Sequence, residues 1–296
     1  VISDEAHRSI GGNARAVFEY FVGYKLGLTA TPKDYLKSYD PNKVNVHDAR
    51  EYERRTMLDT YETFGCKDRE PTFRYSLLDG VKDGFLINPY VLDARTDVTT
   101  QLLSDKGYAV VVKNEEGDDE ERIFKQKDFE RKFFSEHTNE VFCRTILEKG
   151  LCDPISGEFG KAIVFAVSQE HAAKIANIFN EMSHHLWPGR YQSDFAMQVT
   201  SLIENAQQYT INFSDKNNNL RGTATFIEWY KTSKARICVT VGMMTTGYDC
   251  TDILNIVLMR PIFSPTDFIQ IKGRGTRKHQ FNDQVIDLEK RKELAD

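Results

Sequence analysis

With 296 residues, 40% of them hydrophobic and 28% charged, the sequence is long enough for one large or two medium-sized domains with real cores. It has no apolar run long enough to span a bilayer and no signal-peptide pattern, so we expect no membrane protein. The five cysteines form no Cys-x-x-Cys pair, which favours free thiols in a reducing cytoplasm over a disulfide framework or a zinc site. The formal net charge of −5 does not indicate a nucleic-acid-binding protein, although a basic groove can lie on an acidic chain.

The first 95 residues are predicted to form part of an α/β domain, because short apolar runs alternate there with helix-like segments. The expected strands are Val1–Ser3, Tyr24–Thr29 and Phe85–Leu92. The expected helices are Asn13–Val22, Asp48–Phe64 and a short one after Tyr75. Pro32 ends the second strand, because proline lacks the backbone N–H that a strand ladder needs.

Residues 96–160 have the least regular pattern and are predicted to be a linker or insertion. Tyr108–Val112 alternates like a strand and Arg122–Phe124 resumes an extended pattern, so the two indicate a hairpin with a charged tip. A solvated loop is the simpler interpretation of that tip. Apolar residues at helical spacing over Phe129–Lys149 predict a helix.

Residues 161–296 are predicted to form a second α/β domain. Lys161–Val167 is nearly continuously apolar, which is typical of a strand buried on both faces, and Ser168 can cap the helix that follows to about Met182. The other expected strands are Asp194–Val199, Arg236–Val241, Asn255–Met259 and Val285–Leu288, and the other expected helix is Ala224–Thr232. This alternation implies a mostly parallel, doubly wound sheet.

Two adjacent acids, Asp4 and Glu5, follow the first strand. A strand that ends in Asp-Glu is suited to hold Mg²⁺ and to activate water, with Asp4 in the metal shell and Glu5 beside the attacking water. Taken alone, the pair fits an ordinary strand end with a helix-capping acid better. His7 can titrate near neutral pH, although a histidine after a strand is usually structural.

Small and polar residues follow two further strands. They are Thr29, Thr31, Thr245, Thr246, Gly247 and Asp249. Hydroxyl groups can exchange hydrogen bonds without repacking a large side chain, and Gly247 allows the backbone to approach a ligand closely. Asp249 can accept a hydrogen bond from a ribose or from a residue of the other domain. The simpler interpretations are a polar turn before Pro32 and a capping role for Asp249.

Another helix is predicted to start at Ser264, which is followed by proline and, three residues on, by an acid. Gln270, Arg274 and Arg277 then fall at i, i+4 and i+7, on one helical face. Such a face is suited to an arginine finger that acts across domains, because guanidinium groups neutralise the charge that develops on a γ-phosphate. A solvated basic face is the alternative.

Two glycines interrupt that helix, at a cost of ~1 kcal/mol each. Gly273 and Gly275 therefore predict a close approach by another backbone or by a nucleotide, which a solvated face would not explain.

In this order, the segments resemble motifs II, III, V and VI of the superfamily 2 helicases and translocases. They are Asp4-Glu5-Ala6-His7 (a DEAH box), Leu28–Pro32, Thr245–Asp249 and Gln270–Arg277. Further stretches resemble the R (motor) subunit of type I restriction-modification enzymes, namely Asp4–Ser9, Leu26–Pro32, Thr63–Gly65, Tyr75–Gly84 and Pro89-Tyr90. The resemblance covers nearly the whole chain and is weakest over residues 96–160.

The resemblance implies an α/β fold of two RecA-like domains, made of residues 1–95 and 161–296. It implies ATP and Mg²⁺ as cofactors, double-stranded DNA as a partner together with modification and specificity subunits, and ATP-driven DNA translocation by a parent enzyme that cuts DNA at a distance. The implied catalytic residues are Glu5, Arg274 and Arg277, with Asp4 and Glu5 at the metal. The implied nucleotide-binding and coupling residues are His7, Thr29, Thr31, Gly247, Asp249, Gln270 and Gly273. The implied nucleic-acid contacts are Ser168, Ser201, Thr245 and Thr246.

One family motif has no counterpart in the sequence: the Gly-x-x-x-x-Gly-Lys-Ser/Thr loop that cradles phosphates, which precedes motif II in the family. We therefore expect the first domain to lack N-terminal strands, the nuclease domain to be absent from this chain, and the chain alone not to hydrolyse ATP. Two alternatives stay open. One is a general DNA-repair or RNA helicase with the same two domains, and the other is a non-catalytic module that binds DNA or partner subunits.

Overall fold

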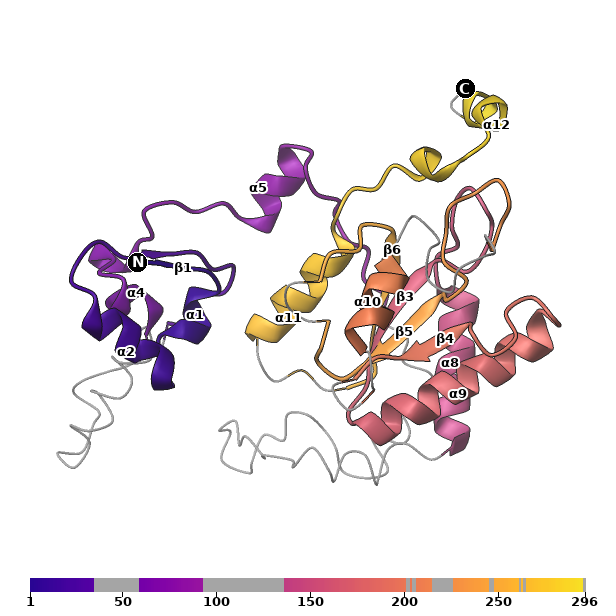
Figure 1. The fold of residues 1–296 in the computed structure, drawn as a ribbon, viewed down its shortest axis with the longest axis horizontal. Helices are drawn as coiled ribbons and strands as arrows, with labels where there is room; N and C mark the ends of the chain where they lie inside the picture. Colours follow the sequence, from indigo (N-terminus) through magenta and orange to yellow (C-terminus); the bar gives the residue numbers. More distant parts are fainter. Residues whose placement is uncertain are drawn as a thin grey trace, which may run out of the picture. The chain divides into compact units, whose positions relative to one another are not determined.

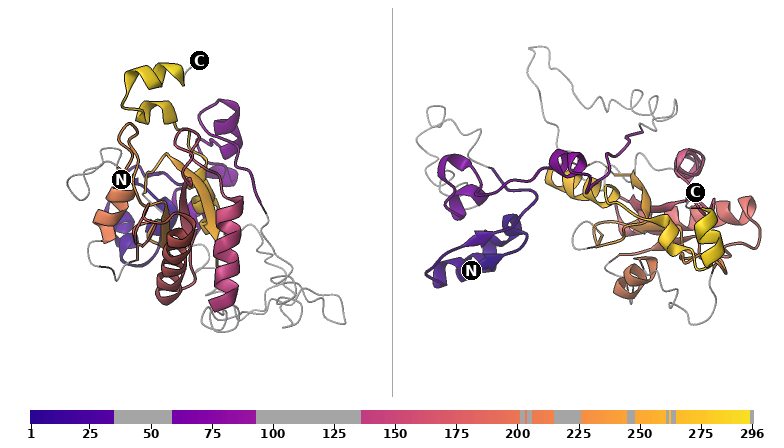
Figure 2. Two further views of the ribbon diagram at one scale, coloured as in Figure 1. Left: turned by 90° about the vertical axis from the view of Figure 1, so that its right-hand side faces the viewer. Right: turned by 90° about the horizontal axis from the view of Figure 1, so that it is seen from above.

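The structure is a computed structural model that describes residues 1–34, 59–92, 136–200, 203, 206–214, 226–244, 248–260, 262 and 265–294. The chain divides into two compact units: unit 1 is Val1–Gly84 with Ser264–Gln270, and unit 2 is Phe85–Phe263 with Ile271–Asp296. Each unit combines helices with parallel strands (Figures 1 and 2), which confirms the predicted α/β class. The domain boundaries proposed at residues 95 and 160 stay predictions.

Unit 1 is built on a two-stranded parallel sheet. β1 (Ile2–Ser3) pairs with β2 (Leu26–Gly27), and the Leu28 N–H donates to the Ser3 carbonyl over 2.9 Å. The connection between the strands contains α1 (Ala6–Ser9) and α2 (Gly12–Tyr20). The predicted order of strand, helix and strand is therefore confirmed at the start of the chain.

Aromatic packing holds this sheet against its helices. Phe18 of α2 meets Phe64 edge to face, with ring centroids 5.5 Å apart. A Cβ at Gly27 would lie only 2.8 Å from the Phe64 ring, so only glycine lets β2 come this close. Phe64 follows α4 (Thr60–Thr63), whose N-terminus is capped by the buried Asp59 side chain. Only the end of the helix predicted over residues 48–64 lies within the described residues.

Two more short helices follow α4 in unit 1. The 3₁₀ helix η1 (Lys67–Arg69) is followed by α5 (Leu77–Lys82). Ser76 and Asp79 form a reciprocal capping box at the start of α5, as expected for a short helix that needs its terminal N–H groups satisfied. This helix was predicted after Tyr75.

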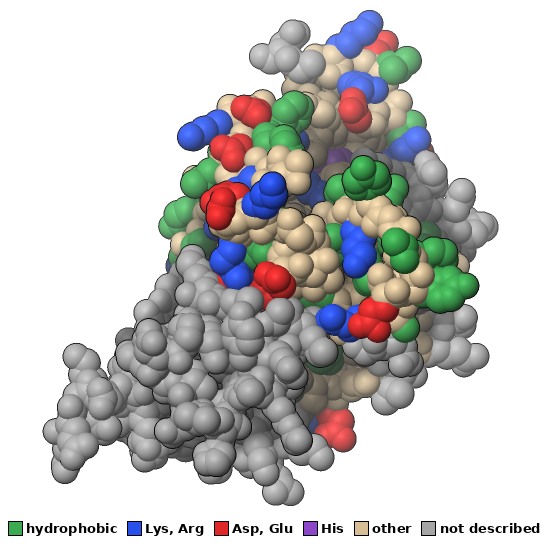
Figure 3. Space-filling view, turned by 90° about the vertical axis from the view of Figure 1, so that its left-hand side faces the viewer, with side chains coloured by type: hydrophobic (Ala, Val, Ile, Leu, Met, Phe, Trp, Pro, Cys, Tyr) green, Lys and Arg blue, Asp and Glu red, His purple; other side chains and the backbone are tan. Residues whose placement is uncertain are grey.

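Hydrophobic side chains reach the surface among charged ones on the face drawn in Figure 3. Within unit 1 the exposed ones include Ile2 and Leu26, which are partners in the β1–β2 register, and Leu28. One face of the small sheet is thus apolar and exposed in the part of the chain that the structure describes.

Unit 2 contains a four-stranded sheet in the order β4-β5-β3-β6, in which every pair is parallel. The strands are β3 (Lys161–Phe165), β4 (Ala196–Gln198), β5 (Ile237–Thr240) and β6 (Ile253–Leu258). All five residues of β3 are buried, which confirms the prediction of a strand covered on both faces.

Helices cover both faces of this sheet (Figure 1). Ala162 and Val164 of β3 pack in one cluster with α8 (Glu136–Lys149) and α9 (Gln169–Leu186). Ile163 and Phe165 pack in a second cluster with α10 (Ala206–Ser214) and with Ile271. The alternation along one strand therefore separates two cores in a three-layer arrangement.

The C-terminal part begins with α11 (Pro265–Lys272), which contributes residues to both units. The 3₁₀ helices η2 (Gly273–Gly275) and η3 (Phe281–Gln284) follow, and α12 (Leu288–Glu293) is the last described helix. Among the described residues, we find no helix with the length and hydropathy needed to cross a membrane.

Three predicted elements are wrong. The strand over Phe85–Leu92 is reduced to one bridge between Leu86 and Arg277, because Pro89 interrupts it and most of its apolar side chains are exposed. The helix at Ala224–Thr232 is replaced, over its described residues, by turns and bridges around Tyr230. The strand at Val285–Leu288 is a single bridge from Val285 to Tyr230, after which α12 begins.

Tyr230 explains the last two errors. Its side chain is fully buried, and its hydroxyl donates a 2.9 Å hydrogen bond to the Asp153 carboxylate, 77 residues away in the chain. This tertiary contact outweighs local propensity, which is a weak bias. The hairpin predicted over residues 108–124 lies outside the described residues.

Candidate functional site

In unit 1 the predicted site residues follow two strands that lie side by side. Asp4 and Glu5 follow β1, and Thr29 and Thr31 follow β2. Because β1 and β2 are parallel, their carboxyl ends lie at the same edge of the sheet, and the Ala6 N–H donates to the Leu28 carbonyl over 2.9 Å. Ligands of open α/β sheets bind at such an edge.

Glu5 has a strained backbone. Its φ of 46° and ψ of 47° lie in the left-handed region, where it forms the N-terminal boundary of α1. A non-glycine residue in this region costs of the order of 1–3 kcal/mol, and such residues concentrate at functional sites. The conformation is supported by the Asp4 side chain, whose Oδ1 accepts the Glu5 N–H over 2.9 Å.

His7 connects the two strand ends. Its imidazole is 4% exposed, and Nδ1 lies 2.8 Å from Thr29 Oγ1 and 3.4 Å from Glu5 Oε2. Burial lowers the pKa of His7 below its ordinary value; the Glu5 carboxylate opposes this shift, and Lys33 and Arg8 add to it. The ring is therefore neutral at pH 7, with one nitrogen as donor and one as acceptor.

Two further predicted residues lie beside His7. The Thr31 N–H donates to Thr29 Oγ1 over 3.0 Å. Gln270, which clusters with unit 1, lies with its Nε2 at 3.5 Å from His7 Nε2 and 3.4 Å from Thr31 Oγ1. These two separations are long for hydrogen bonds. The structure nevertheless brings His7, Thr29, Thr31 and Gln270 together, although they come from separate sequence motifs.

The donor groups at the end of β1 fit a magnesium ion that is shared with a phosphate. Asp4 is exposed and the Glu5 side chain is 38% exposed, so both carboxylates can reach a ligand. Mg²⁺ in phosphoryl-transfer sites takes one or two carboxylates, phosphate oxygens and several waters. Among the described residues, no group of three or more His, Cys, Asp or Glu side chains could hold a metal, so phosphate or water oxygens would have to complete the shell.

The predicted single helical face of Gln270, Arg274 and Arg277 is wrong. The α-helix ends at Lys272, Arg274 lies in the 3₁₀ helix η2, and Arg277 forms an extended bridge with Leu86. Gly273 and Gly275 explain the early end, because glycine is a poor helix former.

The two arginines instead contact the end of motif V. Arg277 Nη1 forms an ion pair with Asp249 Oδ1, and Arg274 Nη1 donates to the Tyr248 carbonyl. The Asp249 side chain is 73% exposed and that of Arg277 31% exposed. Exposed ion pairs contribute only ~0–1 kcal/mol, so Arg277 can exchange Asp249 for another anion at little cost.

The glycines near these arginines differ from each other. A Cβ at Gly275 would lie 3.0 Å from Ile256 Cγ1 of β6, so this position is tightly packed. At Gly273, no atom of the described residues lies within 4 Å of such a Cβ. A close approach of protein backbone therefore does not explain Gly273, and its contact with a nucleotide stays a prediction.

The remaining predicted residues lie apart or cannot be placed. Ser168 caps α9, because its hydroxyl accepts the His171 N–H over 3.1 Å. Thr245, Thr246, Gly247 and Ser201 lie outside the described residues. Three further residues near these groups were not predicted. Tyr248 accepts a hydrogen bond from Arg274 through its carbonyl, and the side chains of Thr251 and His279 lie 2.9 Å apart. Their only signal in the sequence is their nearness to the motifs.

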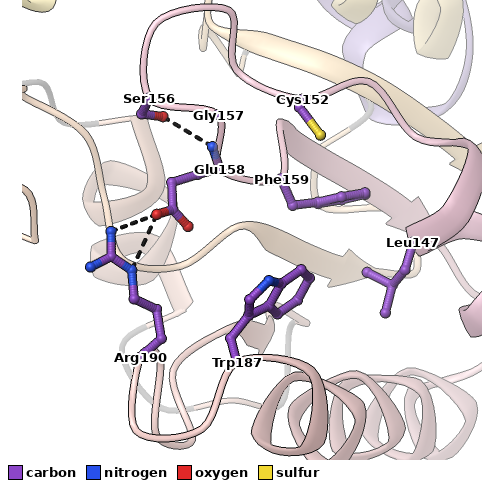
Figure 4. Close-up of a pocket in the computed structure, with 8 residues that line it drawn as sticks. All are labelled: Leu147, Cys152, Ser156, Gly157, Glu158, Phe159, Trp187 and Arg190. Carbon is purple, nitrogen blue, oxygen red and sulfur yellow. Dashed lines mark hydrogen bonds and ion pairs between the residues drawn. The ribbon is translucent and has the colours of Figure 1, made fainter.

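A pocket of about 180 Å³ lies elsewhere in unit 2, between the segment that precedes β3 and the end of α9 (Figure 4). Trp187, Phe159 and Leu147 contribute apolar side chains to it, and Glu158 pairs with Arg190 at its rim. No predicted site residue lines this pocket, so it is separate from the groups above.

No protein-family model matches the chain. Over 94% of its length it is 27% identical to the type I restriction enzyme EcoAI endonuclease subunit of Escherichia coli, and over 89% it is 25% identical to the EcoKI endonuclease subunit of strain K12. These alignments cover 29% and 19% of the two relatives, so the chain spans less than a third of their length.

A solved structure has a similar fold. It is described as a fragment of the HsdR subunit of a type I restriction enzyme from Vibrio vulnificus YJ016, with a TM-score of 0.53 and 25% identity. The match covers 92% of this chain and 40% of that one. The chain is therefore homologous to the endonuclease (HsdR) subunits of type I restriction enzymes.

Proposed function

We propose that the chain is part of an ATP-dependent motor that translocates double-stranded DNA, within the R subunit of a type I restriction enzyme. The observation that carries the proposal is the contact of His7 with Thr29 beside Asp4 and Glu5, at two adjoining strand ends. The homology of most of the chain to restriction endonuclease subunits supports it. The whole enzyme would be a site-specific deoxyribonuclease with modification and specificity subunits as partners.

The proposed roles follow the charge and position of each group. Glu5 polarises the attacking water, and Asp4 with Glu5 contributes to the shell of Mg²⁺, which neutralises phosphate charge when bound. The neutral His7 links Glu5 to Thr29, so a change at either strand end alters the hydrogen bonding of the other. Arg274 and Arg277 stabilise the charge that develops on the γ-phosphate.

The remaining assignments belong to the same proposal. Residues 1–95 and 161–296 would be parts of two RecA-like domains. Gly247, Asp249 and Gly273 would approach the nucleotide, while Thr245, Thr246, Ser168 and Ser201 would contact DNA.

The test is ATP hydrolysis by the full-length protein with duplex DNA, single-stranded DNA, RNA or no nucleic acid. We expect strong stimulation by duplex DNA alone. Stimulation only by RNA or single strands would indicate a helicase of another family. No hydrolysis under any condition would indicate a module that binds DNA or partner subunits.

A variant then tests the site itself. Glu5→Gln removes the charge that polarises water, so we expect turnover to be abolished while ATP still binds. Glu19→Gln is the matched control, because Glu19 is an exposed carboxylate of α2 in the same unit, paired with Arg15. Undiminished turnover in Glu5→Gln would remove Glu5 from the mechanism.

A further inference from the structure

A second pocket of unit 2, of about 500 Å³, lies outside the residues assigned above. Its lining includes Lys231, Thr251, Lys278, His279, Asp283 and Gln284. Volumes of this size are typical of sites for small organic ligands.

The charge of this pocket is positive. Lys231 and Lys278 are exposed, and neither takes part in an ion pair of the described residues. The Asp283 carboxylate is ion-paired with Arg291, which neutralises the one acid in the lining. Two ammonium groups are therefore available to an anion.

Gln284 is a buried polar residue in the lining of the pocket. Its side chain is 3% exposed, and its Nε2 donates to Asp252 Oδ2 over 3.2 Å. Because Asp252 is a carboxylate, this bond fixes the orientation of the amide and leaves Oε1 as an acceptor, without a partner among the described residues. A buried acceptor without a donor costs ~1–3 kcal/mol, so the Gln284 amide is an unsatisfied polar group in the lining of the pocket.

The pocket is adjacent in sequence to the proposed catalytic groups. Lys278 directly follows Arg277, and Thr251 comes two residues after Asp249. Arg277 pairs with Asp249, and His279 Nδ1 lies 2.9 Å from Thr251 Oγ1, so the two segments are joined at two points. The pocket is therefore lined in part by the same two segments that carry the Asp249–Arg277 pair.

We propose that this pocket binds a phosphate group through Lys231 and Lys278. Flexible ammonium groups bind a multiply charged oxyanion as point charges, and no unpaired carboxylate in the lining competes for them. The volume exceeds that of a bare phosphate, so the site has room for a phosphate with its attached sugar and base, either in a DNA strand or in a free nucleotide. The DNA source rests on the proposed function, whereas phosphate binding does not.

The first experiment is binding of a labelled duplex to the full-length protein without ATP, measured by fluorescence anisotropy over a range of salt concentrations. Lys231→Ala and Lys278→Ala should each weaken binding to all sequences and lower the slope of log K against log salt by about 0.9, the value for one lost phosphate contact. Lys278→Arg should restore both. Lys174→Ala, at an exposed lysine of α9, is the control and should change neither.

The second experiment is calorimetric titration with inorganic pyrophosphate. If duplex binding is unchanged but pyrophosphate affinity falls about tenfold in both alanine variants, the pocket does bind phosphate, and the phosphate belongs to a free nucleotide. Unchanged binding of both probes would overturn the proposal. Neither readout needs ATP hydrolysis, so a failure of the proposed motor function remains distinguishable from a failure of this site.

Discussion

A side-chain contact between His7 and Thr29 joins the ends of β1 and β2 in the proposed site. Thr29 Oγ1 lies 2.8 Å from His7 Nδ1 and also accepts the Thr31 N–H. Because the pKa of His7 is lowered, the ring stays neutral at pH 7, and it can donate with one nitrogen while it accepts with the other. Loss of the Thr29 hydroxyl should therefore remove the hydrogen bonding between the two strand ends without changing the backbone there.

Thr29→Val tests this link. It removes the partner of His7 and leaves the Thr31 N–H without its acceptor, so we expect kcat for DNA-stimulated ATP hydrolysis to fall about tenfold, with little change in KM. Thr63→Val is the control, because it also removes a hydroxyl of unit 1, one that donates to the Asp59 carbonyl over 2.8 Å. Equal kcat values in both variants would contradict a coupling role for Thr29.

The buried pair of Lys161 and Asp252 is the clearest electrostatic feature of unit 2. Nζ lies 2.7 Å from Oδ2, and the two side chains are 2% and 4% exposed. Burial alone would raise the pKa of Asp252, but Lys161 and hydrogen bonds from Cys250, Lys161 and Gln284 lower it to about 2. The pair should therefore affect the free energy of unfolding as a function of pH.

Since the folded pKa lies below the ordinary value of 3.8, Asp252 stabilises the fold fully above pH 3.8 and loses that effect as the pH falls through about 2. The pH-dependent part is roughly 2 kcal/mol. Asp252→Asn leaves Lys161 buried without an anion, at a cost of ~3–5 kcal/mol. Urea unfolding from pH 2 to 5 should show the difference between wild type and variant shrinking towards pH 2.

The double variant Lys161→Met/Asp252→Leu removes both charges, so it controls for the cost of leaving Lys161 buried without a partner. It should recover much of the stability, because two apolar side chains can replace a buried ion pair. A constant difference between wild type and Asp252→Asn over the whole pH range would contradict the low pKa.

At the scale of elements, α9 starts at Ser168, for which the sequence offered two roles. In the structure, the Ser168 hydroxyl caps the N-terminus of this 18-residue helix. A contact with nucleic acid stays a prediction for the same residue. The two roles respond differently to charge, because an acid caps a helix well but repels a phosphate.

We therefore predict that Ser168→Ala lowers the free energy of unfolding by ~1 kcal/mol, whereas Ser168→Asp retains it. If Ser168 also contacts DNA, the fully stable Ser168→Asp variant should bind a duplex more weakly than wild type. Thermal unfolding and anisotropy titrations of both variants measure the two roles separately. Unchanged DNA affinity would leave Ser168 with the capping role alone.

The elements predicted well are those with strong local signals. The apolar run at Lys161 and the cap at Ser168 correctly gave β3 and α9, and the acids after Ser3 were correctly expected at a strand end. The helix α10 was missed because its sequence is largely polar. The Asp249–Arg277 pair joins residues 28 apart, and its geometry depends on where η2 ends the helix, which residue spacing alone did not reveal.

At the scale of the molecule, the two units differ in how much core they contain. Among the described residues, the buried hydrophobic side chains of unit 1 are Ala6, Ile10 and Phe18, whereas unit 2 has separate clusters on the two faces of its sheet. Sheets of two strands are marginal unless helices cover them, and Ile2 and Leu26 remain exposed. Over the residues that the structure describes, unit 1 therefore has the smaller hydrophobic core.

The strand order of unit 2 also has a consequence for synthesis on the ribosome. β3 is central, but its two neighbours, β5 from Ile237 and β6 from Ile253, come much later in the chain. This fully buried strand therefore leaves the ribosome long before it can pair, and such long-range parallel pairing is slow.

Nascent chains stalled before Ile237 should consequently bind chaperones and remain sensitive to protease, whereas chains that extend beyond Leu258 should become resistant. Protease resistance of the shorter chains would show that other residues cover β3 before β5 and β6 are synthesised. On this view, the order of the strands makes the protein depend on chaperones during its production, whatever its stability once folded.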